Sequence, residues 1–132
     1  MPEATDPRRL AGLIGPVLLA LGATEAWNMD IYATQTAPVV YLNGTLLFVA
    51  GLALVRAHNR WSLRWPVLVT LTGWASLLVG LYRMAAPDAP QAGEGLGTWV
   101  MLGVIAAFGA VLTWKSRAPG SVAEDGRERG PV

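Results

Sequence analysis

Four long apolar blocks dominate the pattern of hydrophobic and polar positions along the chain. They cover residues 10–29, 39–56, 66–84 and 97–114. Each is close to the roughly 20 residues that a bilayer core of about 30 Å requires at about 1.5 Å per helical residue. A helix of a soluble bundle shows a polar face at every turn, and these blocks do not. The pattern predicts an all-α fold, a transmembrane four-helix bundle with antiparallel neighbours and short loops.

The two ends of the chain are polar and poor in apolar residues. Residues 1–9 include Pro2 and Pro7, and residues 116–132 mix glycine, proline and both kinds of charge. Such segments bury too little apolar surface to fold, so we expect a disordered lead at 1–9 and a disordered tail at 116–132. The 132 residues then form one domain, a transmembrane unit at residues 10–115.

The basic residues predict the orientation of the helices in the membrane. If the helices alternate in direction, nine of the ten lysines and arginines fall on one side, and Arg83 alone lies on the other. The positive-inside rule makes that side, with both termini, cytoplasmic. A cleaved signal peptide is the alternative for the N-terminus, but the first apolar run is long and lacks a clean small-x-small site before Glu25. Many arginines, alanines and glycines indicate a bacterial source, and so the inner membrane.

The composition excludes several classes of function. The chain is 53% hydrophobic and 14% charged, which lies outside the soluble globular class. It has no cysteine, and its net charge of +1 offers no footprint for nucleic acid. His58 is the single histidine, and no nucleophile–base pair, paired carboxylates or phosphate loop occurs. We therefore predict that the chain is not an enzyme and holds no metal or cofactor.

Small and polar residues form stripes within the apolar blocks. In the third block Thr72, Ser76, Gly80 and Arg83 lie within about 40° of one another on a helix. A polar stripe that ends in an arginine is expected to face protein rather than lipid. Two further stripes predict close helix packing. They are the pair Gly22 and Ala26, and the set Gly103, Ala106, Ala107 and Ala110.

Counting residues along the predicted helices places three polar residues at a similar depth in the membrane. Counted from the cytoplasmic ends, Glu25, Arg83 and Asn43 lie about 22, 26 and 20 Å into the membrane. A lone charge facing lipid there is costly, so we predict a Glu25–Arg83 ion pair inside the bundle. The predicted buried polar cluster consists of Glu25, Asn28, Asn43, Thr72, Ser76 and Arg83.

The cytoplasmic loop at residues 57–65, AHNRWSLRW, is the most distinctive segment outside the blocks. Arginines and tryptophans recur in it at a spacing of four, so a short helix here would be amphipathic. We interpret the loop as an anchor on anionic lipid, with a docking surface for a partner as the alternative. Its histidine is expected at the surface or against a partner. The candidate contact residues are Arg56, His58, Arg60, Trp61, Arg64 and Trp65.

Two runs carry a resemblance to known proteins. YLNGTLLFVAGLALVRAHNRW at residues 41–61 and WPVLVTLTGW…GLYRM at residues 65–84 are similar to a group of uncharacterised small four-helix bacterial inner-membrane proteins. The resemblance covers roughly residues 10–87 and implies no activity. One acidic residue in the first of four short helices also resembles the small multidrug transporters, but their other motifs do not occur in this chain.

Two functions are compatible with these features. The first is a non-enzymatic accessory, scaffold or assembly partner of a larger membrane complex, because the chain has almost no soluble mass. The alternative is a small homo-oligomeric transporter or channel for a polar solute, ion or proton, built around the polar cluster. The expected partners are the lipid bilayer and either a larger membrane complex or further copies of the chain, and not nucleic acid. A wet cavity that reaches the outer surface favours transport, and a dry, fully paired cluster favours a structural role.

Overall fold

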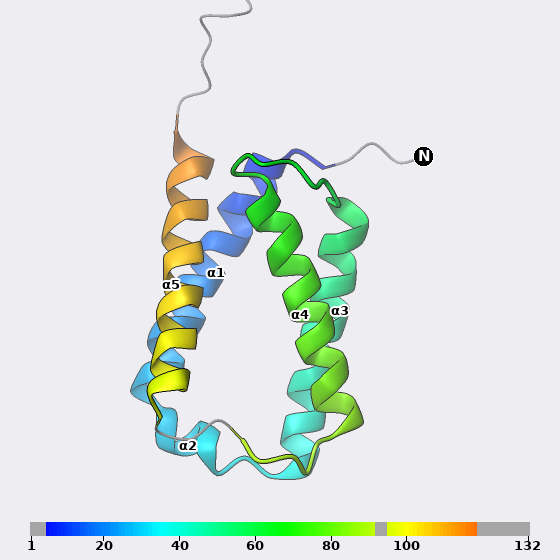
Figure 1. Ribbon diagram of the computed structural model, residues 1–132, viewed down its shortest axis with the longest axis vertical. Helices are drawn as coiled ribbons and strands as arrows, with labels where there is room; N and C mark the ends of the chain where they lie inside the picture. The colour runs from blue at the N-terminus through cyan, green and yellow to red at the C-terminus, as the bar shows by residue number, and fades with distance from the viewer. Residues whose placement is uncertain (1–4, 92–94, 119–132) are drawn as a thin grey trace, which may run out of the picture.

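The computed structural model describes residues 5–91 and 95–118. It contains α1 (Pro7–Trp27), α2 (Met29–Ala33), α3 (Ala37–Ala57), α4 (Val67–Ala85) and α5 (Leu96–Arg117), and no strand within the described residues (Figure 1). The prediction of an all-α bundle with four long helices is confirmed. The short helix α2 lies in the connection for which only a loop was expected.

The first long helix begins earlier than the composition suggested. Asp6 caps α1 by accepting a hydrogen bond from the backbone N–H of Arg8 at 2.9 Å, and Pro7 occupies the first turn, where proline is well tolerated. The Arg8 Nη1 donates to the carbonyl oxygen of Ala118 at 2.8 Å and so joins the start of α1 to the end of α5. Residues 7–9 and 116–117, assigned to disordered segments, are therefore helical. Residues 1–4 and 119–132 lie outside the described part.

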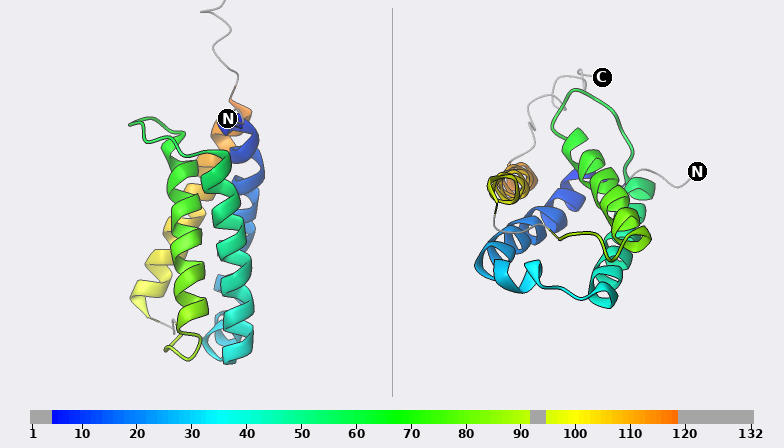
Figure 2. Two further views of the ribbon diagram at one scale, coloured as in Figure 1. Left: turned by 90° about the vertical axis from the view of Figure 1, so that its right-hand side faces the viewer. Right: turned by 60° about the horizontal axis from the view of Figure 1, so that its bottom comes forward.

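The long helices form two antiparallel pairs, α3 with α4 and α1 with α5 (Figures 1 and 2). Glycines allow each close approach. A Cβ added at Gly44 would lie 2.9 Å from the carbonyl oxygen of Gly80, and one added at Gly51 would lie 2.8 Å from that of Gly73. In the other pair, a Cβ added at Gly109 would lie 2.9 Å from the carbonyl oxygen of Gly15. Backbone therefore packs on backbone within each pair.

The predicted packing stripes are only partly correct. Gly22 of α1 does face Ala106 of α5, since an added Cβ would lie 3.5 Å from the Ala106 Cβ. Gly103, however, has nothing within 4 Å of an added Cβ, and Gly109 makes the close contact instead. The backbones of α1 and α3, the long helices on either side of α2, do not pack on each other in the described part of the chain. The short connection that contains α2 therefore joins helices of different pairs.

The two pairs are joined at one end of the molecule. A buried cluster of Ala11, Ile14, Val69 and Leu112 brings α1, α4 and α5 together, and Leu54 of α3 packs against it. The few close backbone approaches between the pairs all involve α4. Figure 1 shows the ribbons closer together at this end than at the end that carries α2. The fold is therefore a bundle of two tight pairs around a small core at one end.

The outer surfaces of all four long helices are apolar. Each helix has 19 to 22 residues and is long and apolar enough to cross a membrane. Large apolar side chains such as Leu13, Val49 and Val104 are exposed on them. Exposure of this extent is unfavourable in water and suits contact with lipid. The structure thus supports a multi-pass membrane protein.

Candidate functional site

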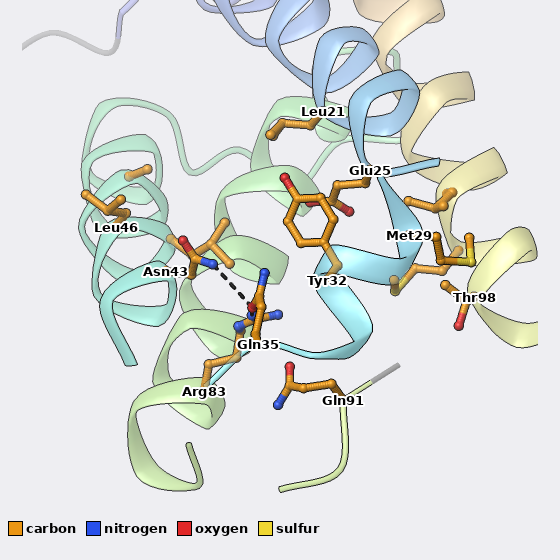
Figure 3. A pocket seen from close by; sticks show the side chains of 14 residues that line it. Leu21, Glu25, Met29, Tyr32, Gln35, Asn43, Leu46, Arg83, Gln91 and Thr98 are labelled. Atoms are coloured by element: carbon orange, nitrogen blue, oxygen red, sulfur yellow. Dashed lines mark hydrogen bonds between the residues drawn. The ribbon is translucent and has the colours of Figure 1, made fainter. Parts of the chain in front are cut away.

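A partly open cavity of about 370 Å³ lies between the two helix pairs, at the end that carries α2 (Figure 3). Its volume falls in the range of about 300–1,000 Å³ that is typical of small-molecule sites. Apolar side chains form most of its wall, with a few polar groups among them. The lining residues come from all the helices and two loops: Leu21, Glu25, Met29, Tyr32, Gln35, Asn43, Leu46, Leu47, Ala50, Arg83, Gln91, Thr98, Met101 and Leu102.

Arg83 is held in the cavity wall by a glutamine. Its Nη2 donates a hydrogen bond to the Oε1 of Gln35 at 2.8 Å, and the Nδ2 of Asn43 donates to the same oxygen at 3.4 Å. The Nε of Arg83 is buried and has no hydrogen-bond partner among the described residues. The connection between α2 and α3 is short, which keeps Gln35 next to the first turns of α3 and the last turn of α4. A neutral amide therefore satisfies part of the guanidinium.

Glu25 and Arg83 do not form the direct ion pair that their shared depth suggested. No salt bridge, with nitrogen and oxygen within 4.0 Å, joins them in the described structure. Both nevertheless line the cavity, Glu25 from α1 and Arg83 from α4. The physical reason is that these helices belong to different pairs, which contact each other mainly at the opposite end. The two charges face one cavity and are not joined.

Three members of the predicted polar cluster lie outside the cavity. The Nδ2 of Asn28 donates to the carbonyl oxygen of Thr24 at 2.9 Å and caps the end of α1. Thr72 is buried and donates to the carbonyl oxygen of Leu68 at 2.8 Å, and Ser76 is only half-buried. Thr72 and Ser76 are about 16 and 10 Å from Arg83 along α4, so they share its stripe but not its depth. Of the predicted cluster, the structure brings together Glu25, Asn43 and Arg83.

The cavity also contains polar residues that the sequence did not single out. Tyr32 comes from α2, and Gln35 and Gln91 come from the loops that close this end of the molecule. Figure 3 shows Tyr32 and Gln35 between Glu25 and Arg83 in its view. No periodicity marks such residues, because they lie outside the long helices. The only available signal is that both glutamines lie in short connections close to the level of Arg83.

The candidate lipid or partner contact at residues 57–65 is not a helix. The chain is irregular from His58 to Arg64, so the spacing of four does not place the two tryptophans on one face. Trp61 is 64% exposed, whereas Trp65 packs against the buried core cluster. The three predicted arginine contacts are exposed, namely Arg56, Arg60 and Arg64. The surface part of the prediction therefore reduces to these arginines and Trp61.

Side-chain hydrogen bonds hold this loop against α4. The hydroxyl of Thr70 accepts from the N–H of Arg60 at 3.1 Å and donates to the carbonyl oxygen of the same residue at 3.0 Å. The Oδ1 of Asn59 accepts from the indole nitrogens of Trp61 and Trp74 at 3.0 and 3.2 Å. The two Thr70 bonds satisfy the backbone N–H and carbonyl oxygen of Arg60 without a helix.

His58 is buried, contrary to the surface position predicted for it. Its side chain is 1% exposed, and neither ring nitrogen has a hydrogen-bond partner in the described structure. It follows directly on α3, and its backbone N–H bonds to the carbonyl oxygen of Leu54 at 2.8 Å. This helix end directs the imidazole into the protein.

Two substitutions near this loop are expected to differ in sign. In Thr70→Val the loop backbone loses both of its bonds to the hydroxyl, so the free energy of unfolding is expected to fall by about 1–3 kcal/mol. In His58→Leu a buried polar ring without partners becomes apolar, so stability is expected to remain or to rise. Thermal unfolding of the purified variants in one detergent measures both. A loss in His58→Leu as large as that in Thr70→Val contradicts the unpartnered state of the imidazole.

The chemistry of the site is that of binding. Its ionisable residues are one carboxylate, one guanidinium and Tyr32, with three amide side chains around them. Among residues 5–91 and 95–118, no group of three or more His, Cys, Asp or Glu residues could hold a metal ion. The arrangement suits recognition of a small molecule by charge and hydrogen bonds within an apolar wall. No family model matches the chain, and no curated protein or solved structure matches it either.

Proposed function

We propose that this chain binds a small solute in the cavity between its two helix pairs and takes part in the movement of that solute across a bacterial inner membrane. The observation that carries the proposal is that Glu25 and Arg83 line one partly open cavity without a salt bridge between them. A structural staple would join these charges directly, because an unpaired charge in a membrane is costly. Charged groups left facing a cavity are typical of solute pathways.

The connection between the pairs supports a role in transport as well as in binding. Each pair is rigid through its glycine contacts, and the pairs meet mainly at the core of Ala11, Ile14, Val69 and Leu112. A small rotation about this core changes the width of the cavity at the other end. Rocking of rigid helix groups around a central site is an established way to alternate access. The cavity is formed within one chain, so a second copy is not needed to build it.

The charge pattern supports an orientation for the site. The exposed arginines 56, 60 and 64 lie at the end opposite to α2, near the core that joins the pairs. With that end cytoplasmic, as the positive-inside rule indicates, the cavity lies in the outer half of the membrane. Both ends of the chain then lie on the cytoplasmic side.

Cysteine labelling tests whether water and solutes reach the cavity. The chain has no cysteine, so a single one can be introduced without a background. Ala50 lines the cavity, whereas its neighbour Val49 has the same depth on α3 and is exposed on the outer surface of the helix. Only a thiol in water ionises, so Ala50→Cys is expected to react with a membrane-impermeant maleimide at least about ten-fold faster than Val49→Cys. The measurement uses the full chain in lipid vesicles.

The same experiment can refute the proposal. Equal and slow labelling of Ala50→Cys and Val49→Cys means that the cavity is closed to water, which contradicts a solute site. Val49→Cys is the matched control, since it differs from Ala50→Cys only in the face of α3 that it occupies. Reagent added to either side of the vesicle reports which side the cavity faces.

A second function, that of an accessory to a larger membrane complex, is favoured by the loop after α3. Trp61 is 64% exposed, and Leu63 between Arg60 and Arg64 is fully exposed. Such a surface suits anionic lipid headgroups or the acidic surface of a membrane partner. Co-purification from the native membrane distinguishes the two functions. A stoichiometric larger partner supports the accessory role, and isolation of this chain without one contradicts that role.

A further inference from the structure

The two charges of the cavity form no salt bridge, either with each other or with another described residue. Glu25 accepts no hydrogen bond from any other described residue, and its carboxylate extends toward the cavity from α1 (Figure 3). Arg83 extends from α4 and has one neutral acceptor, Gln35, at 2.8 Å. Its half-buried guanidinium therefore still lacks a negative group. An anionic site and a cationic site face the same small volume from different helix pairs.

The balance of charge defines what fits between them. The net charge of Glu25 and Arg83 together is zero, so a ligand with a single charge would satisfy one residue and leave the cavity charged. A ligand that carries an ammonium and an acidic group satisfies both residues and leaves the cavity neutral. Ion pairs and charge-assisted hydrogen bonds are strongest where water is excluded. A zwitterion therefore gains most from this arrangement.

The apolar part of the cavity wall indicates that the ligand also carries an apolar group. The apolar part of the cavity wall includes Leu21, Leu46, Leu47, Met101 and Leu102. These side chains offer no hydrogen bonds and favour an apolar substituent, which gains roughly 25 cal/mol for each Å² removed from water. The volume of about 370 Å³ leaves room for such a group beside the two charges.

We propose that the cavity binds a zwitterion with an apolar substituent, whose ammonium faces Glu25 and whose acidic group faces Arg83. This inference rests on the proposed solute site and names the class of its ligand. Two sources supply this chemistry, a free apolar amino acid and the headgroup of a phosphatidylethanolamine. Tyr32, Gln35 and Gln91 then donate or accept hydrogen bonds around the headgroup or backbone of the ligand.

Matched probes test the proposal by calorimetric titration of the full chain in an uncharged detergent at neutral pH. Leucine carries both charges, isoamylamine lacks its carboxylate, isocaproate lacks its ammonium, and dihexanoyl phosphatidylethanolamine represents the lipid. We expect leucine or the lipid to bind at least about ten-fold more tightly than either singly charged probe. Tighter binding of the lipid assigns the ligand to the bilayer, and tighter binding of leucine assigns it to the free solute.

Variants assign each charge of the ligand to one residue. In Glu25→Gln the ammonium loses its partner, so leucine is expected to bind no better than isocaproate. In Arg83→Gln the carboxylate loses its partner, so leucine is expected to bind no better than isoamylamine. Asp30→Asn and Arg56→Gln are the matched controls, because both residues are exposed and neither lines the cavity. These controls are expected to bind leucine as the unmodified chain does.

The outcomes separate this inference from the proposed function. If isoamylamine or isocaproate binds the unmodified chain as tightly as leucine and the lipid do, the proposal of a zwitterionic ligand is wrong. The probe comparison needs no variant, so it stands even where a substitution prevents folding. If Ala50→Cys is labelled and no probe binds, the solute site stands and the ligand class is overturned. If Ala50→Cys is not labelled, both proposals fail.

Discussion

Gly80→Ala is expected to lower the free energy of unfolding by about 1–3 kcal/mol, the usual effect of overpacking a tight contact. A Cβ at this position would lie 2.7 Å from the carbonyl oxygen of Gly44 and 2.8 Å from the Cα of Phe48. These are backbone atoms of α3, so no side chain can rotate to make room, and the α3–α4 pair must separate. Arg83 and Asn43 lie one turn away, on α4 and α3, so the cavity is expected to change as well.

Gly103→Ala is the matched control for this substitution. Gly103 also lies in the middle of a long helix, and nothing is within 4 Å of a Cβ added there. The same chemical change is therefore expected to leave stability unchanged or to raise it by up to about 1 kcal/mol, because alanine favours a helix over glycine. Unfolding of both variants with increasing dodecyl sulfate in mixed micelles measures the difference. Equal losses at Gly80 and Gly103 would show that α3 and α4 are not in backbone contact.

The long helices were predictable because the bilayer imposes one simple requirement on them. A span needs a run of about 20 apolar residues, and such a run is visible without knowledge of any contact. The ends of the helices were less predictable, since they depend on single hydrogen bonds. The start of α1 is set by the side chain of Asp6, and the irregular loop before α4 is set by Thr70 and Asn59.

The pairing of the helices could not be read from the sequence. Several small-residue stripes compete in this chain, and each is an equally good packing surface by composition. The structure uses Gly109 of α5 and leaves Gly103 exposed, although both lie in the same helix. The choice depends on which face the partner helix presents, and this is a property of the whole fold.

The candidate site was predictable in depth but not in contacts. Counting residues along helices predicts that Glu25, Asn43 and Arg83 share one level, and all three line the cavity. Depth along the helix axis, however, does not give the lateral positions of two residues, so it cannot predict whether they are in contact. Gln35 lies outside the long helices and takes the place at Arg83 that was assigned to Glu25.

A double-mutant cycle is expected to find a larger coupling between Gln35 and Arg83 than between Glu25 and Arg83. The Gln35 Oε1 accepts from the Arg83 Nη2 at 2.8 Å, whereas the carboxylate of Glu25 makes no salt bridge within 4.0 Å. Hydrogen bonds to charged groups contribute about 1.5–3 kcal/mol, so the Gln35–Arg83 coupling is expected in that range. Gln35→Leu, Glu25→Gln and Arg83→Met, alone and in pairs, supply the two cycles. Unfolding in mixed micelles without ligand is the measurement.

Bound ligand is expected to raise the coupling energy that the Glu25–Arg83 cycle measures. A zwitterion bound between Glu25 and Arg83 connects the two residues through its own charges, so their coupling rises when leucine or the short-chain lipid is present at saturation. The Gln35–Arg83 coupling does not rise in the same way, because that bond exists without ligand. A Glu25–Arg83 coupling that is already the larger one without ligand means that the two charges meet directly in the membrane. The cavity would then be closed by a staple between the helix pairs, and the structural role would replace the transport role.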